Sequence, residues 1–272
     1  MGDKFFMGIK LVVTDLDGTL LNSEQKVSTE NKEAVRAAVD SGVVVTIATG
    51  RMYSSALPYA KQLAIDVPII TYNGAVIQSV NGKVIFERFV EPTLVKAVAA
   101  FCRERNWYVQ IYSDDNLYFA EHNDKAKSYE ELAGIKGIAV GDKLYDLDSR
   151  VPKMLVMTDT AEETDGYIEM LQSKFEGKLF VVKSNPTYIE IVSPAVNKAA
   201  ALTILREKLQ IDKADVMAIG DSGNDIPMLK EAGKSVAMRN AVKSIQQLCD
   251  YVTDDCDHSG VAKAINKFVL KN

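Results

Sequence analysis

The stretch Leu11-Val12-Val13-Thr14-Asp15-Leu16-Asp17-Gly18-Thr19 decides the fold, because an apolar run ends here directly in two carboxylates. The β-branched run predicts a buried strand, and Gly18 marks the turn that follows it. Residues two apart in an extended backbone project the same way, so Asp15 and Asp17 are expected side by side. Like charges this close repel, and they call for a cation, a shared proton or an anion to be processed. A carboxylate can also attack phosphorus and form an aspartyl-phosphate. A strand that merely ends in an acidic turn is the alternative.

The composition is that of an ordinary globular protein with one or two domains. The 272 residues are 47% apolar and 25% charged, with a net charge of −5. We expect no nucleic-acid partner from this acidic balance, and no membrane span or signal peptide, since Met1–Lys10 lacks an apolar core. The cysteines and histidines are too scattered for a zinc cluster and indicate reduced thiols; they are Cys102, Cys249, Cys256, His122 and His258. These features predict a soluble cytoplasmic enzyme or binding protein.

The pattern of strands and helices changes twice along the chain. Residues 1–83 alternate strand and helix, and residues 194–272 return to that alternation. Between them, over residues 84–193, the order helix–strand–strand occurs twice, which indicates a separate α+β module with a largely antiparallel sheet. We therefore predict an α/β fold with a doubly wound, mostly parallel sheet as its core. The core domain would consist of 1–83 and 194–272, and the inserted domain of 84–193.

Three predicted core strands, Leu11–Thr14, Val43–Ala48 and Val216–Ile219, end in polar residues. Ligands of open α/β sheets bind beyond the carboxyl ends of the strands, so parallel neighbours would bring these residues into one crevice. Carboxylates are hard oxygen ligands of the kind that magnesium prefers, and a threonine hydroxyl or a glycine N–H can hold a phosphate oxygen. The residues that follow the three strands are, in order, Asp15 with Asp17, Thr49 with Gly50, and Asp221.

Four further polar residues have both a functional and a structural interpretation. Lys198 begins a predicted helix, where the helix dipole disfavours a cation, so it is easier to understand facing carboxylates or an anion than as an exposed lysine. Asn224 and Asp225 can cap the helix entered at Pro227, which does not exclude a supporting role at a metal. Arg51 fits a structural salt bridge at least as well as a phosphate contact.

With these residues assembled, the chain resembles the haloacid dehalogenase superfamily, and within it the Cof-like branch of sugar-phosphate phosphatases. The resemblance spans the whole chain, including a large α/β cap between the second and third motifs. Ala199 follows Lys198 where the family usually has glycine, and we expect no change of chemistry from it. The four motifs stand here as Asp15-Leu16-Asp17-Gly18-Thr19, Thr49-Gly50-Arg51, Lys198 and Gly220-Asp221-Ser222-Gly223-Asn224-Asp225, and Asn73-Gly74-Ala75 and Tyr188-Ile189-Glu190-Ile191 also look like this branch.

The resemblance implies a magnesium-dependent phosphatase. Asp15 would be the nucleophile, and Asp17 the general acid and then the general base. Because the namesake dehalogenases lack the second aspartate, Asp17 argues for phosphate chemistry. The predicted Mg²⁺ site comprises Asp15, the backbone carbonyl of Asp17, Asp221, Ser222 and Asp225. The predicted phosphate site comprises the backbone of Leu16, Thr49, Gly50, Lys198 and Asn224.

The expected substrate is a small phosphorylated metabolite, and five residues are candidates for selecting it. Each candidate has packing or solvent contact as its alternative role. A phosphosugar mutase or phosphotransferase, and a non-catalytic phosphometabolite-binding module, are the competing functions. Asp15 and Asp17 together speak against the module, since binding an anion does not call for adjacent carboxylates. The sequence leaves the oligomeric state open. The candidates for substrate selection are Arg51, Tyr53, Tyr112, Asn185 and Tyr188.

Overall fold

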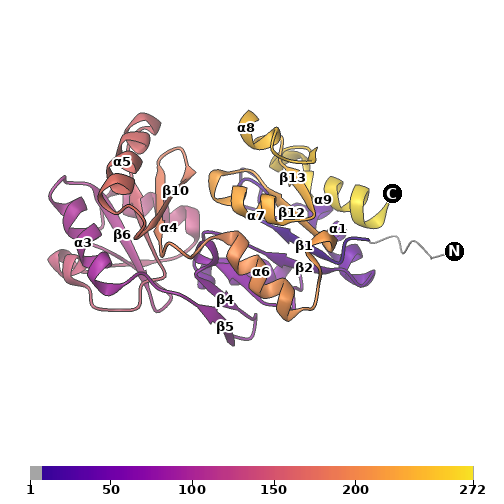
Figure 1. Cartoon of the computed structure of the whole chain (residues 1–272), viewed down its shortest axis with the longest axis horizontal. Coiled ribbons are helices and arrows are strands. Elements are labelled where there is room, and N and C mark those ends of the chain that lie inside the picture. Colours follow the sequence, from indigo (N-terminus) through magenta and orange to yellow (C-terminus); the bar gives the residue numbers. More distant parts are fainter. Residues whose placement is uncertain (1–7, 272) are drawn as a thin grey trace.

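The computed structural model describes residues 8–271, which form two bodies side by side (Figure 1). Most of the segment Met1–Lys10, for which we expected no signal peptide, lies outside the described residues. Among the helices that are described, none combines the length and the apolar character needed to cross a membrane.

The larger body is built on a five-stranded parallel sheet in the order β14-β13-β12-β1-β2. Thr14 of β1 is level with Ile47 of β2 on one side and Ile219 of β12 on the other. Val12 packs in one hydrophobic cluster and Val13 in another, so both faces of the sheet are buried. The strands are β1 (Leu11–Thr14), β2 (Val44–Ile47), β12 (Val216–Gly220), β13 (Lys234–Ala237) and β14 (Tyr251–Val252).

Helices cover this sheet, and two of them are capped at their N-terminal ends by a polar side chain. The Ser28 hydroxyl accepts a hydrogen bond from the Asn31 N–H, and the Asn197 side chain accepts one from the Ala200 N–H. The helices are α1 (Thr29–Asp40), α2 (Tyr53–Gln62), α6 (Lys198–Lys208), α7 (Ile226–Glu231), α8 (Lys243–Gln246) and α9 (Gly260–Ile265). Short turns of 3₁₀ or π helix are η1 (Tyr72–Gly74), η3 (Lys213–Asp215), η4 (Gly223–Asp225), η5 (Cys256–His258) and η6 (Asn266–Leu270).

The smaller body is the predicted α+β module, with its own hydrophobic cluster. Its six-stranded sheet has the order β10-β11-β9-β6-β7-β8 and is antiparallel except between β7 and β8. The strands are β6 (Tyr108–Ser113), β7 (Asn116–Phe119), β8 (Gly137–Ala139), β9 (Lys153–Met157), β10 (Phe180–Asn185) and β11 (Tyr188–Val192). The helices are α3 (Pro92–Arg103), α4 (Asp124–Ala133), η2 (Gly141–Asp146) and α5 (Ala161–Lys174).

A small antiparallel sheet of β3 (Ile69–Thr71), β4 (Val76–Gln78) and β5 (Val84–Glu87) lies next to the core. It contains a hairpin across the Asn81-Gly82 turn, and Ile70 makes a parallel bridge to Ala48 after β2. Strand β5 pairs here and not in the six-stranded sheet, although the module was predicted to begin at residue 84. The domain limits 84 and 193 therefore stay a proposal, whereas the predicted doubly wound core with an inserted α+β module is confirmed.

Candidate active site

The three strand ends that were predicted to converge lie at one edge of the core sheet. The Asp15 N–H donates to Ile219 O at 3.0 Å, and the Ala48 N–H donates to Thr14 O at 2.9 Å. These hydrogen bonds hold the ends of β1, β2 and β12 level with one another. As a result, residues more than 200 positions apart in the sequence share one crevice.

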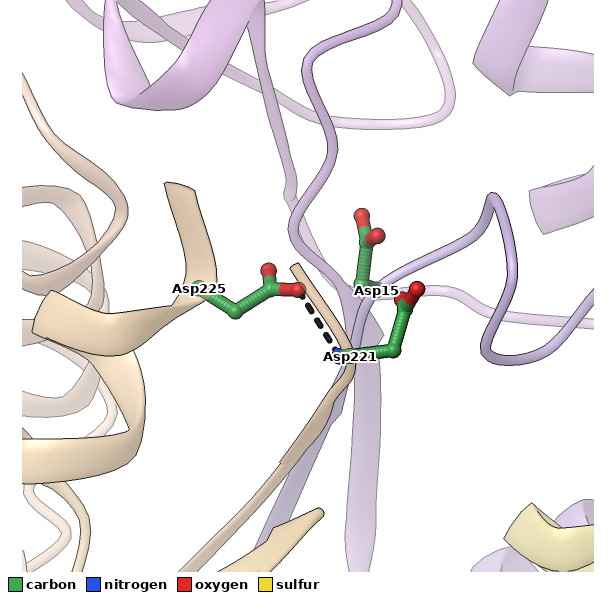
Figure 2. A group of neighbouring side chains, drawn as sticks. All are labelled: Asp15, Asp221 and Asp225. Atoms are coloured by element: carbon green, nitrogen blue, oxygen red, sulfur yellow. Dashed lines mark hydrogen bonds between the residues drawn. The ribbon is translucent and has the colours of Figure 1, made fainter. Parts of the chain in front are cut away.

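Three carboxylates gather there: Asp15, Asp221 and Asp225 each place an oxygen within 4.8 Å of the others (Figure 2). Asp225 is oriented by its own loop, since its Oδ2 accepts the N–H groups of Asp221 and Ser222 at 3.0 Å each. Asp221 is held by the Thr19 hydroxyl, which donates to its Oδ1 at 2.7 Å. This donor set of hard oxygens fits a divalent cation.

Lys198 is the cation of this cluster. Its Nζ lies 2.7 Å from Asp15 Oδ1 and 2.6 Å from Asp225 Oδ1, and its side chain is completely buried. Lys198 is the first residue of α6, where the helix dipole alone would disfavour it. The two carboxylates account for its position, and the alternative of an exposed helix lysine is wrong.

The charges in this crevice do not balance. Burial raises the pKa of Asp15 well above its ordinary value, and the charge of Asp225 raises it further, while Lys198 opposes both. Burial and the charge of Asp225 likewise raise the pKa of Asp221 to about 7. Burial would lower the pKa of Lys198, but Asp15 and Asp225 raise it above its ordinary value. The carboxylates are thus short of positive charge, as a metal site is before the ion binds.

Asp17 lies outside the three-carboxylate cluster and pairs with Arg51. Arg51 Nε donates to Asp17 Oδ2 at 2.8 Å, and Nη2 donates to Oδ1 at 2.6 Å. The same guanidinium donates to Gln25 Oε1 and, at 3.2 Å, to Ser55 Oγ. Arg51 is thus in the salt bridge that was one of its two interpretations. Its side chain is nearly buried, whereas that of Asp17 is 43% exposed.

The turn after Asp17 requires glycine. Gly18 has a φ of +70°, and a Cβ added to it would lie 2.6 Å from Asp221 Oδ2. A side chain at this position would therefore push against one of the clustered carboxylates.

The loop after β2 is held by hydrogen bonds on both sides. The Arg51 N–H donates to Thr49 Oγ1 at 3.1 Å, so the threonine hydroxyl keeps its own proton to donate to an anion. The Asn73 N–H donates to Thr49 O at 3.0 Å. The Asn73 side chain in turn accepts from Asn224 Nδ2 at 3.0 Å, which ties the second and fourth motifs together.

A cavity of about 700 Å³ opens over this crevice, between the core and the inserted module. It brings together Asp15, Asp17, Gly50, Arg51, Asn185, Tyr188, Asp221, Ser222 and Asn224 from the predicted site. Thr49, Lys198, Asp225 and Leu16 are buried next to these residues.

Two predicted residues for substrate selection do not line this cavity. The Tyr53 hydroxyl donates to Ser79 O at 2.8 Å, away from the crevice. Tyr112 is completely buried where the inserted module packs against the core, edge-on to the ring of Tyr72, and its hydroxyl accepts from Gln110 Nε2 at 2.7 Å. The geometry therefore gives no support to a direct substrate contact for either tyrosine.

Lys153 and Glu190 line the cavity, and sequence reasoning gave neither of them a role. Glu190 lies in a stretch that was noted only for its resemblance, and Lys153 begins an otherwise apolar strand, Lys153–Met157. A lysine at the start of a buried strand was the available signal. The role of this lysine depends on where the module contacts the core, and the local sequence pattern does not predict that contact.

The comparisons with known proteins agree with this geometry. Residues 12–265 match the haloacid dehalogenase-like hydrolases, and the chain belongs to this family. Among its relatives are two 5-amino-6-(5-phospho-D-ribitylamino)uracil phosphatases of Bacillus subtilis (strain 168), YwtE and YcsE. YwtE is 32% identical, with 96% of this chain and 98% of the relative covered. YcsE is 34% identical, with 96% of each covered.

Solved structures place the chain more narrowly. A haloacid dehalogenase-like hydrolase from Bacteroides thetaiotaomicron has a TM-score of 0.85 at 30% identity and covers 95% of this chain and 99% of its own. The subclass IIB sugar phosphatase BT4131 has a TM-score of 0.83 at 27% identity and covers 95% and 98%. The protein is a phosphomonoesterase of the Cof-like branch.

Proposed function

We propose that this phosphatase is magnesium-dependent and hydrolyses sugar phosphates and related phosphomonoesters through an aspartyl-phosphate on Asp15. The observation that carries the proposal is the contact of Lys198 with both Asp15 and Asp225 beneath the cavity. Lys198 keeps Asp15 oriented and favours its ionised form, which is the form that attacks phosphorus. We also keep the cytoplasm as the proposed location, in keeping with the free thiols of Cys102, Cys249 and Cys256.

In the first step Asp15 attacks the phosphorus atom, and the bond between phosphorus and the leaving oxygen breaks. The Thr49 hydroxyl and the Gly50 N–H hold the phosphoryl oxygens. Asp17 gives a proton to the leaving oxygen, and in the second step it takes one from the water that attacks the aspartyl-phosphate. Asp17 lines the cavity and is partly exposed, so it can reach a substrate once Arg51 releases it.

The residues present fit a magnesium ion. Asp15 and Asp221, with the backbone carbonyl of Asp17, would hold Mg²⁺, and Asp225 and Ser222 would support it. When bound, Mg²⁺ supplies the positive charge that these carboxylates lack and polarises the phosphoryl oxygens. Without a cation the same field would repel a phosphate dianion.

The cavity sets the size of substrate that we propose. About 700 Å³ is more than a sugar phosphate alone fills, and the module side of the cavity offers Tyr129, Leu132, Asn185 and Tyr188. Two relatives act on a ribityl phosphate that carries a uracil ring, and this compound therefore belongs among the candidate substrates.

Phosphate release from a panel of sugar phosphates, ribityl phosphates, nucleotides and phosphorylated cofactors tests the proposal. We expect turnover with Mg²⁺ and none after chelation. An isomerised sugar phosphate in place of free phosphate would instead indicate a mutase. Turnover of no phosphomonoester by a verified Mg²⁺-loaded protein would overturn the proposed function.

A further inference from the structure

Lys153 and Glu190 form a buried ion pair in the inserted module. Lys153 Nζ lies 2.7 Å from Glu190 Oε2, and the two side chains are 1% and 6% exposed. The ammonium also lies 4.5 Å from the centre of the Tyr112 ring, and Ser184 Oγ donates to Glu190 Oε1 at 2.9 Å. A buried ion pair seldom stabilises a fold more than apolar residues of the same volume would. Its presence beside the cavity therefore calls for a different explanation.

The ammonium of Lys153 reaches out of its own domain. Its Nζ donates to the backbone carbonyl of Gly50 in the core, at 2.8 Å. That carbonyl belongs to the same peptide unit as the Arg51 N–H, which donates to Thr49 Oγ1. One peptide unit is thus fixed at both ends, by a residue of the module on its carbonyl side and by Thr49 on its N–H side.

The preceding peptide unit is fixed in a similar way from within the core. The Asn73 N–H donates to Thr49 O, the carbonyl of the peptide unit whose N–H belongs to Gly50. Glycine supplies no conformational restraint of its own, so these contacts decide how the loop presents its donors. Gly50 also has no room for a side chain, since an added Cβ would lie 3.0 Å from Asn73 Oδ1 and 3.4 Å from Glu190 Oε1.

We propose that Lys153 is a positioning residue, through which the inserted module orients the phosphate-binding loop Thr49-Gly50-Arg51. The inference rests on the proposed function, because it takes this loop to bind the phosphoryl group. Lys153 holds the Gly50–Arg51 peptide so that the Arg51 N–H stays on Thr49 Oγ1. The threonine hydroxyl then points its proton at the anion and not at the backbone. Glu190 keeps the ammonium in place.

The double variant Lys153→Met/Glu190→Gln tests the proposal, because it removes the Gly50 contact while net charge is unchanged and no buried charge is left unpaired. Glu190→Gln alone keeps an amine that can still donate to Gly50 O. Asp115→Ala is the matched control for a general weakening of the contact between the inserted module and the core. Asp115 is a module residue that accepts from Tyr72 OH at 2.8 Å and from the Ser54 N–H, so it joins the module to the core without a hydrogen bond to Thr49 or Gly50.

The readout is the dissociation constant for inorganic phosphate in excess Mg²⁺, measured by calorimetry well below the melting temperature of each variant. We expect binding about ten-fold weaker in the double variant, which is the scale of one lost charge-assisted hydrogen bond. Asp115→Ala should stay within about two-fold of the wild type, and Glu190→Gln should lie between the wild type and the double variant, because it keeps the amine but loses the carboxylate that orients it.

Unchanged phosphate affinity in the double variant, whatever its melting temperature, would reduce Lys153 to a structural role and overturn the inference. An equal loss in Asp115→Ala would do the same, because docking in general would then account for it. If the wild type binds no phosphate in the presence of Mg²⁺, the proposed function fails together with this inference. If the wild type binds phosphate and the double variant binds it equally well, only the inference about Lys153 is rejected and the proposed function stands.

Discussion

Arg51 holds Asp17 by both carboxylate oxygens, with Nε on Oδ2 at 2.8 Å and Nη2 on Oδ1 at 2.6 Å. A carboxylate whose two oxygens both accept from a guanidinium is arranged as a base and has no proton to give. The proposed general acid must therefore exchange this partner for the leaving group of the substrate. Arg51 is the fixed member of the pair, since Ser55 and Gln25 also hold it.

The variant Asp17→Asn should show a penalty that depends on the leaving group. A sugar alkoxide needs a proton as the bond to phosphorus breaks, whereas nitrophenolate, whose conjugate acid has a pKa of about 7, needs much less help. We expect kcat/KM to fall far more for a sugar phosphate than for p-nitrophenyl phosphate. This parameter reports the first irreversible step, where the leaving groups still differ. Equal losses for both esters, with Mg²⁺ bound normally, would show that Asp17 is not the acid.

The variant Asp15→Asn should separate chemistry from stability. It removes the nucleophilic charge, so turnover should fall by several orders of magnitude. Because burial and neighbouring charge raise the pKa of Asp15, the ionised form is disfavoured in the folded protein. The metal-free variant should therefore melt at a higher temperature than the metal-free wild type at pH 8. Wild-type turnover in this variant would exclude Asp15 as the nucleophile.

The stability of the metal-free protein should fall as the pH rises from about 4 to about 7. Asp221 has a raised pKa of about 7, so between these values the folded state binds more protons than the unfolded state. The contribution of Asp221 to the free energy of unfolding is therefore present at low pH and is lost as Asp221 ionises. Saturating Mg²⁺ should reverse the loss above pH 7, because the ion binds the ionised form.

Thermal melting of the wild type and of Asp221→Asn, each at pH 5.5 and pH 8 with and without Mg²⁺, measures this effect. The variant serves as the reference for all other titrating groups. A wild type and a variant with the same dependence on pH would show that Asp221 does not carry it.

Substrate preference should respond to Tyr188 and not to Tyr112. Tyr188 lines the cavity, whereas Tyr112 is buried beneath it. Tyr188→Ala should therefore reorder the kcat/KM values across a panel of large and small phosphate esters. Tyr112→Phe, which loses only a buried hydroxyl hydrogen-bonded to Gln110 and Tyr129, is the control and should leave the order intact. The reverse pattern would place the specificity contacts inside the module.

Much of the fold follows from local patterns in the sequence. The apolar runs before Asp15, Thr49 and Asp221 are long enough and bounded clearly enough to predict β1, β2 and β12, and parallel pairing then brings their ends together. Strand β8 is absent from the prediction because Gly137–Ala139 is short and carries no alternating pattern. A contact with another segment helps to fix this strand, since the Gly137 N–H donates to Oε1 of Glu130 in α4 at 2.7 Å.

The site is predictable where a residue acts from its own motif and less so where two domains meet. Lys198 faces Asp15 and Asp225, as its unfavourable place at a helix start indicated. The contact of Lys153 with Gly50 joins residues 103 positions apart in different domains. The burial of Tyr112 likewise depends on how the sheet of the module turns, and an aromatic residue in a strand gives no sign of which face it occupies.

The position of β1 between β2 and β12 also decides when the active site can exist. Its neighbour β12 is made about 200 residues later, after the whole inserted module. On a ribosome Asp15 and Asp17 emerge early, while the strand that brings Asp221 and Asp225 to them is still unsynthesised. The three-carboxylate cluster is therefore among the last features of the core to form. A divalent ion can therefore bind at this cluster only after both segments of the core have been made and have paired.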